Sequence, residues 1–257
     1  MNYLEKLFSL KGRISIVTGA ARGNGFAISE ALAIAGSKVL MVDILHEELY
    51  GSCEVLKDKD LDVDCYSFDI TDYSALSGFV KDLKYKYGKI DILVNNAGIS
   101  LGSKIENYDF SDWIKTFDVN VNSPFVMTKE FLPLMKERGG SIINITSLNS
   151  ELAFPDNPAY VASKGALKQL TKSFALDLAK YNIRANNVGP GYFATNMTQK
   201  SYKDTEKREK RENKTMLGRW GHPEDLAGVI IFLSSPAAEY ITGQDIYVDG
   251  GWLAKGL

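Results

Sequence analysis

The sequence predicts an α/β fold in which one parallel, doubly wound sheet of about seven strands is covered by helices on both faces. Two patterns support this prediction. Short, β-rich apolar runs alternate with longer amphipathic stretches along the chain. The first of these runs also enters a glycine-rich turn that opens a helix. No linker, repeat or low-complexity stretch interrupts the alternation, so residues 1–257 are expected to form a single domain.

Most of the apolar runs are too continuous for strands with one solvated face. Continuous runs of this kind are typical of parallel strands covered on both sides. The predicted strands are Arg13–Thr18, Lys38–Val42, Val63–Phe68, Asp91–Val94, Ser141–Thr146, Ile183–Val188 and Asp245–Val248.

Helical spacing of apolar residues appears between these runs. The clearest predicted helices are Phe26–Ala35, Asp72–Tyr87, Asp112–Lys136 and Pro158–Tyr181. Strand and helix therefore alternate as in right-handed βαβ units.

Composition and charge exclude several classes of partner. The formal net charge of −2 and pI near 5.8 provide no basic field for nucleic acid or anionic lipid. The sequence shows neither a secretion signal nor a run of about 18 apolar residues. We therefore expect a cytoplasmic protein with no membrane partner.

Cysteine and histidine are too sparse for a metal centre. Cys53 and Cys65 are the only cysteines, and His46 and His222 are the only histidines. We expect two reduced structural thiols and no metal site.

A dense charge run occupies Ser201–Lys214. It is either a solvated helical face or part of a mobile lid over a substrate, because the chain leaves a strand end before it and returns at Gly218–Trp220. The second interpretation places a substrate lid at residues 192–220.

A phosphate-binding turn is predicted at Thr18–Gly25 (TGAARGNG), directly after the first strand. Glycines let the backbone approach a pyrophosphate, and the following helix N-terminus provides N–H donors. The alternative is a plain tight turn. The candidate cofactor residues of this turn are Gly19, Arg22, Gly23, Asn24 and Gly25.

Asp43, at the end of the second strand, favours NAD over NADP. A carboxylate there accepts hydrogen bonds from the ribose hydroxyls and repels a 2′-phosphate. Arg22 acts in the opposite direction, because a guanidinium could pair with that phosphate. We give Asp43 the greater weight. The sequence thus predicts a Rossmann-type dinucleotide site that prefers NAD.

Two further segments are expected to border the cofactor. Asp69 and Ile70 follow the third strand, where they could meet the adenine edge, although Asp69 could instead cap the next helix. Asn96, Ala97 and Gly98 follow the fourth strand and suit a crevice at the carboxyl end of the sheet.

Tyr160 and Lys164 form the candidate catalytic centre. They are four residues apart on a predicted helix and therefore share one face. A free tyrosine titrates near pH 10, and lowering its pKa by about three units takes roughly 4 kcal/mol. A neighbouring ammonium favours the phenolate, so we expect Lys164 to lower the pKa of Tyr160.

Two residues are expected beside this pair. Ser147 ends the fifth strand and could hydrogen-bond a substrate oxygen, and the side-chain amide of Asn120 could hold a water behind the lysine. Taken singly, each of the four could be a surface pair or a buried polar group. Their order along the chain, in register with the glycine turn and the strand ends, favours the catalytic interpretation.

These motifs resemble the classical short-chain dehydrogenase/reductase family over nearly the whole chain. The matching pieces are TGAARGNG, the aspartate after strand three, NNAG, the asparagine of FDVNV, a serine thirteen residues before YVASK, the pair Pro190-Gly191 with Thr195, and IYVDGG. Within the family, PGYFATNMT, LGRWGHPEDLAGVIIFL and ITGQDIYVDGGW look most like gluconate 5-dehydrogenases and related sugar-acid or polyol dehydrogenases.

The resemblance implies specific roles. Tyr160 would be the general acid/base, Lys164 would bind the nicotinamide ribose, Ser147 would polarise the carbonyl, and Asn120 would position a relay water. Pro190, the backbone near Phe193, and Thr195 would border or hold the carboxamide. The resemblance also implies a homotetramer.

Two positions depart from the family pattern. Asn24 stands where isoleucine or leucine is usual, which affects packing or hydrogen bonding beside the pyrophosphate. Ser123 stands where a glycine often follows, with little expected effect.

The favoured function is hydride transfer between a nicotinamide cofactor and a secondary alcohol or ketone of a sugar acid, polyol or similar small molecule. Candidate substrate contacts are Ser147, Asn149, Tyr160 and Tyr192, with Glu151 and Asn157 as further polar groups. One alternative is a carbonyl reductase of the 3-oxoacyl-carrier-protein reductase type using NADPH. Another is a non-catalytic dinucleotide sensor or scaffold.

Overall fold

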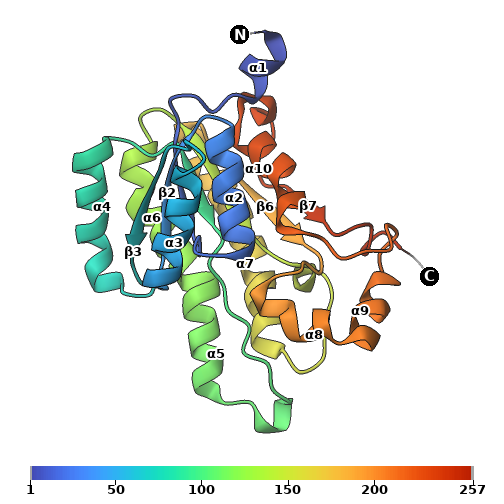
Figure 1. Ribbon diagram of the computed structural model, residues 1–257. Coiled ribbons are helices and arrows are strands. Elements are labelled where there is room, and N and C mark those ends of the chain that lie inside the picture. The colour runs from blue at the N-terminus through green and yellow to red at the C-terminus, as the bar shows by residue number, and fades with distance from the viewer. Residues whose placement is uncertain (1, 256–257) are drawn as a thin grey trace.

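Seven strands form one sheet in the computed structural model, which describes residues 2–255. Every neighbouring pair is parallel, in the order β3-β2-β1-β4-β5-β6-β7 (Figure 1). The reversal between β1 and β4 makes the sheet doubly wound, which confirms the predicted fold class. The strands are β1 (Ile14–Thr18), β2 (Lys38–Asp43), β3 (Val63–Ser67), β4 (Ile92–Asn95), β5 (Gly140–Ile145), β6 (Ile183–Pro190) and β7 (Asp245–Val248).

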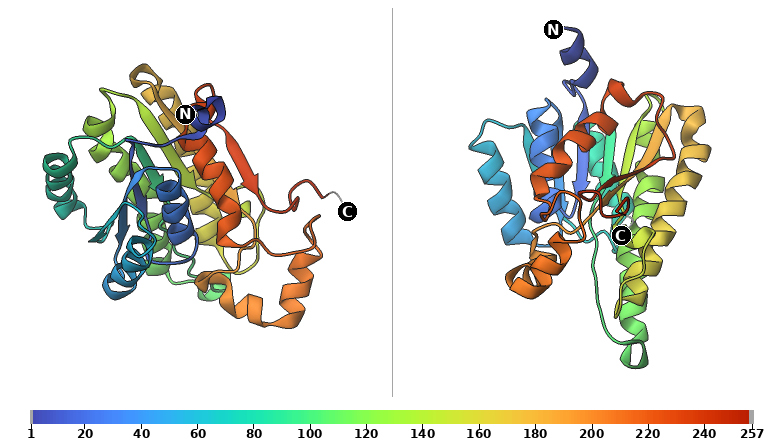
Figure 2. Two further views of the ribbon diagram at one scale, coloured as in Figure 1. Left: turned by 45° about the horizontal axis from the view of Figure 1, so that its top comes forward. Right: turned by 90° about the vertical axis from the view of Figure 1, so that its right-hand side faces the viewer.

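Helices cover both faces of the sheet (Figure 2). One layer consists of α2 (Gly23–Ile34), α3 (His46–Lys57) and α10 (Ala227–Ser234); the other consists of α4 (Tyr73–Tyr87), α6 (Ser123–Met135) and α7 (Pro158–Leu178). Ile28 and Ile230 belong to the apolar core on the first face, and Phe131 and Phe174 belong to the core on the second. Burial of these two cores stabilises the sheet between them.

The long helix predicted at Asp112–Lys136 contains a π turn. Helix α5 (Phe110–Phe117) passes through Asp118–Asn122 into α6, and the amide of Ser123 bonds to the carbonyl of Asp118 five residues back. Pro124 has no N–H and cannot donate to the carbonyl of Asn120. The local widening that follows is typical of functional positions.

The charge run forms two short helices at the carboxyl end of the sheet (Figure 1): α8 (Gln199–Lys203) and α9 (Thr205–Glu212). Asp204 caps α9 by accepting from the amide of Lys207. At the other end of the molecule, the N-terminal helix α1 (Tyr3–Phe8) begins with a capping box between Asn2 and Glu5.

Cys53 is a buried free thiol, and Cys65 is a half-buried one. Between residues 2 and 255, no helix is long and apolar enough to cross a membrane.

Candidate active site

The predicted site residues gather at the carboxyl ends of β1, β4, β5 and β6. Parallel strands end at the same edge of a sheet, and the crevice lies where the strand order reverses. Gly19 follows β1, Asn96 follows β4, and Ser147 comes just after β5.

The glycine turn is a cradle that side chains would fill. A Cβ on Gly25 would lie 2.0 Å from the carbonyl oxygen of Gly19, and Gly19 and Gly23 have φ of +66° and +56°. Helix α2 begins at Gly23 without a side-chain cap, which leaves its first N–H groups for a ligand. The Oδ1 atom of Asn24 is buried and has no hydrogen-bond partner among residues 2–255. The turn therefore fits a dinucleotide pyrophosphate.

Asp43 also supports this turn. Its carboxylate accepts from the amide of Ala21 at 2.9 Å and from that of Leu45 at 3.0 Å. The guanidinium of Arg22 pairs with Glu48 at 2.9 Å on the surface. The acidic group is thus fixed at the end of β2, and the basic group is paired with another carboxylate.

Asn96 ties β4 to the glycine turn. Its side-chain amide donates to the carbonyls of Thr18 and Gly19 at 2.9 and 3.1 Å. The hydroxyl of Thr18 accepts from the amides of Asn96 and Ala97, both at 3.1 Å. This part of the NNAG motif therefore shapes the crevice. Thr18 is a positioning residue that the sequence reasoning did not single out.

Asp69 does not cap α4, because the side chain of Asp72 performs that role by accepting from the amide of Ala75 at 3.1 Å. The Oδ1 atom of Asp69 accepts from the amide and hydroxyl of Thr71 at 2.9 and 2.7 Å. Ile70 is 9% exposed and packs in the core beneath this turn.

Tyr160, Ser147 and Lys164 are brought together. The Nζ atom of Lys164 lies 5.6 Å from the centroid of the Tyr160 ring, and it donates to the carbonyl of Ile145 at 2.7 Å. The lysine is 3% exposed. Gly98 faces it, because a Cβ there would lie 3.5 Å from the ammonium.

The pKa directions correct one prediction. Burial raises the pKa of Tyr160, and a hydrogen bond with the Ser147 hydroxyl opposes the rise. The Lys164 ammonium bonds to the carbonyl of Ile145 rather than to the phenol, and the net pKa of Tyr160 is raised, opposite to the predicted direction. Burial also lowers the pKa of Lys164 to about 8, so its positive charge is only partly retained above neutral pH.

Asn120 lies in the π turn, fully buried. Its Oδ1 accepts from the amide of Ile99 at 2.9 Å, and its Nδ2 donates to the carbonyl of Ile99 at 2.9 Å and to the hydroxyl of Ser163 at 3.0 Å. The predicted water-holding side-chain amide is therefore already committed to protein partners. Pro124 denies an i+4 partner to the Asn120 main-chain carbonyl, which makes this carbonyl the better candidate for holding a water.

The segment after β6 faces the glycine turn. A Cβ on Gly23 would lie 3.5 Å from the Cβ of Thr195. Pro190 is buried at the end of β6, and Phe193 is 4% exposed and packs against Gly221. The predicted carboxamide segment thus lies beside the predicted pyrophosphate turn.

The candidate substrate groups divide into two kinds. The Nδ2 of Asn149 and the Oδ1 of Asn157 are buried without hydrogen-bond partners among the described residues. Asn149 also bonds with Ser147 through its side chain and its amide. Glu151, in contrast, forms an ion pair with Lys168 and accepts from Tyr247 at 2.5 Å. We expect the two asparagines, rather than Glu151, to contact substrate.

A buried amide network spans the strands behind the site. Asn95 donates to Asn144 at 2.8 Å, Asn144 donates to Thr171 at 2.7 Å, and Thr171 donates to Asn187 at 2.6 Å. These contacts couple β4, β5, α7 and β6. Asparagines inside otherwise apolar strands were the signal that could have revealed the network.

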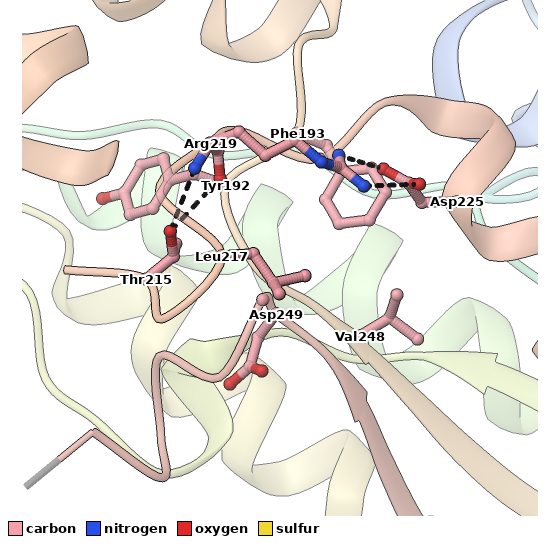
Figure 3. Close-up of a pocket in the computed structure, with 10 residues that line it drawn as sticks. Tyr192, Phe193, Thr215, Leu217, Arg219, Asp225, Val248 and Asp249 are labelled. Atoms are coloured by element: carbon pink, nitrogen blue, oxygen red, sulfur yellow. Dashed lines mark hydrogen bonds and ion pairs between the residues drawn. The ribbon is translucent and has the colours of Figure 1, made fainter. Parts of the chain in front are cut away.

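A cavity of about 170 Å³ lies beneath the returning end of residues 192–220. Figure 3 shows the Arg219–Asp225 ion pair at one side of it. Tyr160, Ser147 and Lys164 do not line it. Among residues 2–255, no group of three or more His, Cys, Asp or Glu side chains could hold a metal ion.

Comparisons with known proteins agree with this geometry. A family model described as enoyl-(acyl carrier protein) reductase matches residues 19–253. Gluconate 5-dehydrogenase of Gluconobacter oxydans is 39% identical over 246 residues, which cover 95% of this chain and 96% of that protein. A 3-oxoacyl-(acyl-carrier-protein) reductase of Thermotoga maritima is 38% identical over 243 residues, covering 94% of this chain and 98% of that protein.

A solved structure of a relative also has a closely similar fold. The gluconate 5-dehydrogenase from Burkholderia cenocepacia, in complex with NADP and tartrate, has a TM-score of 0.94 and 34% identity, covering 98% of this chain and 100% of that one. The matches span the glycine turn, the Tyr160 helix and the segment after β6 alike. The chain belongs to the short-chain dehydrogenase/reductase family of NAD(P)-dependent oxidoreductases.

Proposed function

We propose that the protein transfers hydride between a nicotinamide cofactor and a secondary alcohol or ketone of a sugar acid or closely related polyol. The observation that carries this proposal is the meeting of Tyr160, Ser147 and Lys164 at the sheet edge where the glycine turn lies.

The dinucleotide would be held along this edge by residues from three strand ends. The glycine turn would hold the pyrophosphate, Asp43 would hold the adenosine ribose, Asp69 and Ile70 would border the adenine, and Lys164 would hold the nicotinamide ribose. Asn96, Ala97 and Gly98 would form the floor of the crevice, with Pro190, Phe193 and Thr195 beside the carboxamide. When bound, the nicotinamide provides the hydride acceptor or donor.

Side chains of the protein would accept the proton and stabilise the charges that form. In the oxidative direction the Tyr160 phenolate accepts the hydroxyl proton of the substrate, and the Ser147 hydroxyl donates a hydrogen bond to the same substrate oxygen. The Lys164 ammonium stabilises the phenolate. We assign the relay water to the main-chain carbonyl of Asn120, because the side chain of Asn120 is occupied.

A hydroxyl-rich, acidic substrate is supported by two independent observations. The relatives at 39% and 34% identity are gluconate 5-dehydrogenases. The unpartnered amide atoms of Asn149 and Asn157 provide one donor and one acceptor for hydroxyl groups.

The test is a substrate panel of aldonates, alditols and 3-oxoacyl thioesters, with NADH or NADPH absorbance as the readout. We expect the highest kcat/KM with an aldonate or its keto form. The Thermotoga relative supports a second candidate function, reduction of a 3-oxoacyl thioester. A higher kcat/KM with that thioester and NADPH would replace the proposal.

We propose NAD as the preferred cofactor because the carboxylate of Asp43 is held at the end of β2, where it would repel a 2′-phosphate, and because Arg22 is paired with Glu48. Asp43→Asn keeps a hydrogen-bond acceptor for Ala21 and removes the charge. We expect the NADP-to-NAD ratio of kcat/KM to rise about tenfold or more, because the like-charge repulsion is lost. The matched control Glu48→Gln tests whether freeing Arg22 has the same effect. A wild-type preference for NADP would contradict this assignment.

We propose a homotetramer, supported by large apolar side chains exposed on α5, α6 and α7. Phe110 is 73% exposed, Phe125 is 48% exposed and Leu176 is 80% exposed. Burial of such side chains is a usual driving force for subunit association. Light scattering of the purified protein measures the subunit number.

Residues 192–220 would cover the substrate. The indole Nε1 of Trp220 donates to the carbonyl of Arg208 at 3.2 Å, so the returning end of this segment is attached to α9. Tyr192 and Trp220 are in ring contact at 5.3 Å between centroids. The two ends of the segment thus contact one another.

A further inference from the structure

An aromatic cluster lies beside α9. We define it as Phe154, Tyr192, Tyr202, Trp220 and Trp252. Four ring contacts join its members to Tyr192 and Trp220, with centroid separations from 5.2 to 5.9 Å. Tyr192 is the central member, because its ring contacts three of the other four.

Tyr192 connects this cluster to the chemistry. It follows Pro190-Gly191 at the end of β6, and its phenol is close enough to Tyr160 to influence that group electrostatically. Figure 3 shows the Tyr192 ring directed away from Phe193 and from the Arg219–Asp225 ion pair. Tyr192 also lines the cavity of Figure 3, so the cluster borders that cavity as well as Tyr160.

Arg211 of α9 stacks on this cluster. Its guanidinium carbon lies 4.5 Å from the centroid of the Tyr192 ring and 5.8 Å from that of Trp220. The side chain is half-buried. Stacking uses the flat face of a guanidinium and leaves the N–H donors at its edge available. At that edge, Nη1 donates to the carbonyl of Lys207 at 3.3 Å.

Three other cations, Arg208, Arg219 and Lys168, form ion pairs, whereas Arg211, like Lys210, forms none among residues 2–255. Arg208 lies 3.7 Å from Glu212, Arg219 lies 2.7 Å from Asp225, and Lys168 pairs with Glu151. Within residues 2–255, no carboxylate lies within ion-pair distance of Arg211. A half-buried, preoriented guanidinium without an internal anion is suited to an anion that arrives with a ligand.

We propose that Arg211 binds the carboxylate of the substrate while Tyr160 acts on a hydroxyl farther along the same molecule. This inference rests on the proposed sugar-acid function and adds the residue that selects an acid over a neutral polyol. A planar guanidinium matches a carboxylate through two parallel hydrogen bonds.

The test compares Arg211→Gln with Lys210→Gln, a matched change at an exposed position of the same helix. Each variant is assayed with D-gluconate and with D-glucitol, a neutral alditol of the same chain length. We expect Arg211→Gln to lower kcat/KM for gluconate about 30-fold, because charge-assisted hydrogen bonds are lost. The value for glucitol should change less than threefold. Arg211→Lys should recover part of the loss, since it restores charge without the bidentate geometry.

Tartrate binding to the NAD- or NADP-saturated protein is a second readout that needs no turnover. Tartrate is present in the Burkholderia relative's complex and serves here as a dicarboxylate probe. We expect about 30-fold weaker binding to Arg211→Gln by calorimetry and no such loss with Lys210→Gln. Equal tartrate affinity in both variants would overturn the role of Arg211.

The two proposals fail in different ways. If the wild type does not turn over gluconate but tartrate affinity still depends on Arg211, the sugar-acid substrate is wrong and the carboxylate site stands. If gluconate is turned over and Arg211→Gln affects gluconate and glucitol equally, the substrate class stands and the assignment of Arg211 is wrong.

Discussion

Replacement of Tyr160 by phenylalanine is expected to lower kcat about a thousandfold. The phenol is the group that we place on the substrate oxygen, and general acid–base catalysis contributes roughly 10²–10⁴-fold. Phenylalanine keeps the ring and its packing, so the affinity for NAD should change less than threefold. Steady-state kinetics and fluorescence titration of NADH binding measure the two quantities.

Tyr85→Phe is the matched control, because Tyr85 is 96% exposed on α4. It should leave kcat and cofactor affinity unchanged. If Tyr160→Phe retained more than a tenth of wild-type turnover, another group would have to move the proton. Ser147 could not replace it easily, because a hydroxyl without an adjacent base is a poor proton acceptor.

The fold was predictable because its pattern is local and repeated. Continuous apolar runs mark each strand, and strand boundaries differ from the predicted ones by at most two residues; for example, β6 extends past Val188 to Pro190. The four-residue spacing of Tyr160 and Lys164 places both on one face of α7. These features depend on neighbours in sequence.

The predictions that were wrong concern contacts between segments that are distant in the sequence. The direction of the Tyr160 pKa depends on how deeply α7 is buried and on the carbonyl of Ile145, which engages Lys164. The commitment of the Asn120 amide to Ile99 follows from packing between the π turn and the loop after β4. One sign was present in the sequence, since Pro124 stands four residues after Asn120.

The charge run Ser201–Lys214 also makes a tertiary contact that its sequence does not reveal. Its composition predicts a solvated helix, and most of α9 is exposed. Nothing in the run distinguishes Arg211 from Lys210. Only the fold brings α9 to the aromatic cluster and places one of its four cations over Tyr192. The proposed selectivity for an acidic substrate would therefore depend on tertiary structure, whereas the spacing of the catalytic pair is visible in the sequence.

Replacement of Lys164 by methionine is expected to lower kcat/KM at least a hundredfold and to change how stability depends on pH. Activity falls because the charge beside the phenol and the proposed ribose contact are both lost. The stability effect arises because burial lowers the pKa of Lys164 from 10.5 to about 8. From pH 8 to 10.5 the unfolded chain retains a proton that the folded chain has released, so the free energy of unfolding of the wild type rises with pH in this window.

The methionine variant lacks this titration, so its stability relative to wild type should decline by up to about 3 kcal/mol between pH 8 and 10.5. The variant also loses the hydrogen bond to Ile145 at every pH, which lowers its free energy of unfolding by a constant amount. The informative quantity is therefore how the difference in free energy of unfolding between variant and wild type changes with pH. Urea unfolding at several pH values measures it. Lys172→Met, at a position of α7 whose side chain is 41% exposed, is the control. A pH-independent difference for Lys164→Met would mean that the buried ammonium keeps its ordinary pKa, and the ion would then stabilise the phenolate across the whole physiological range.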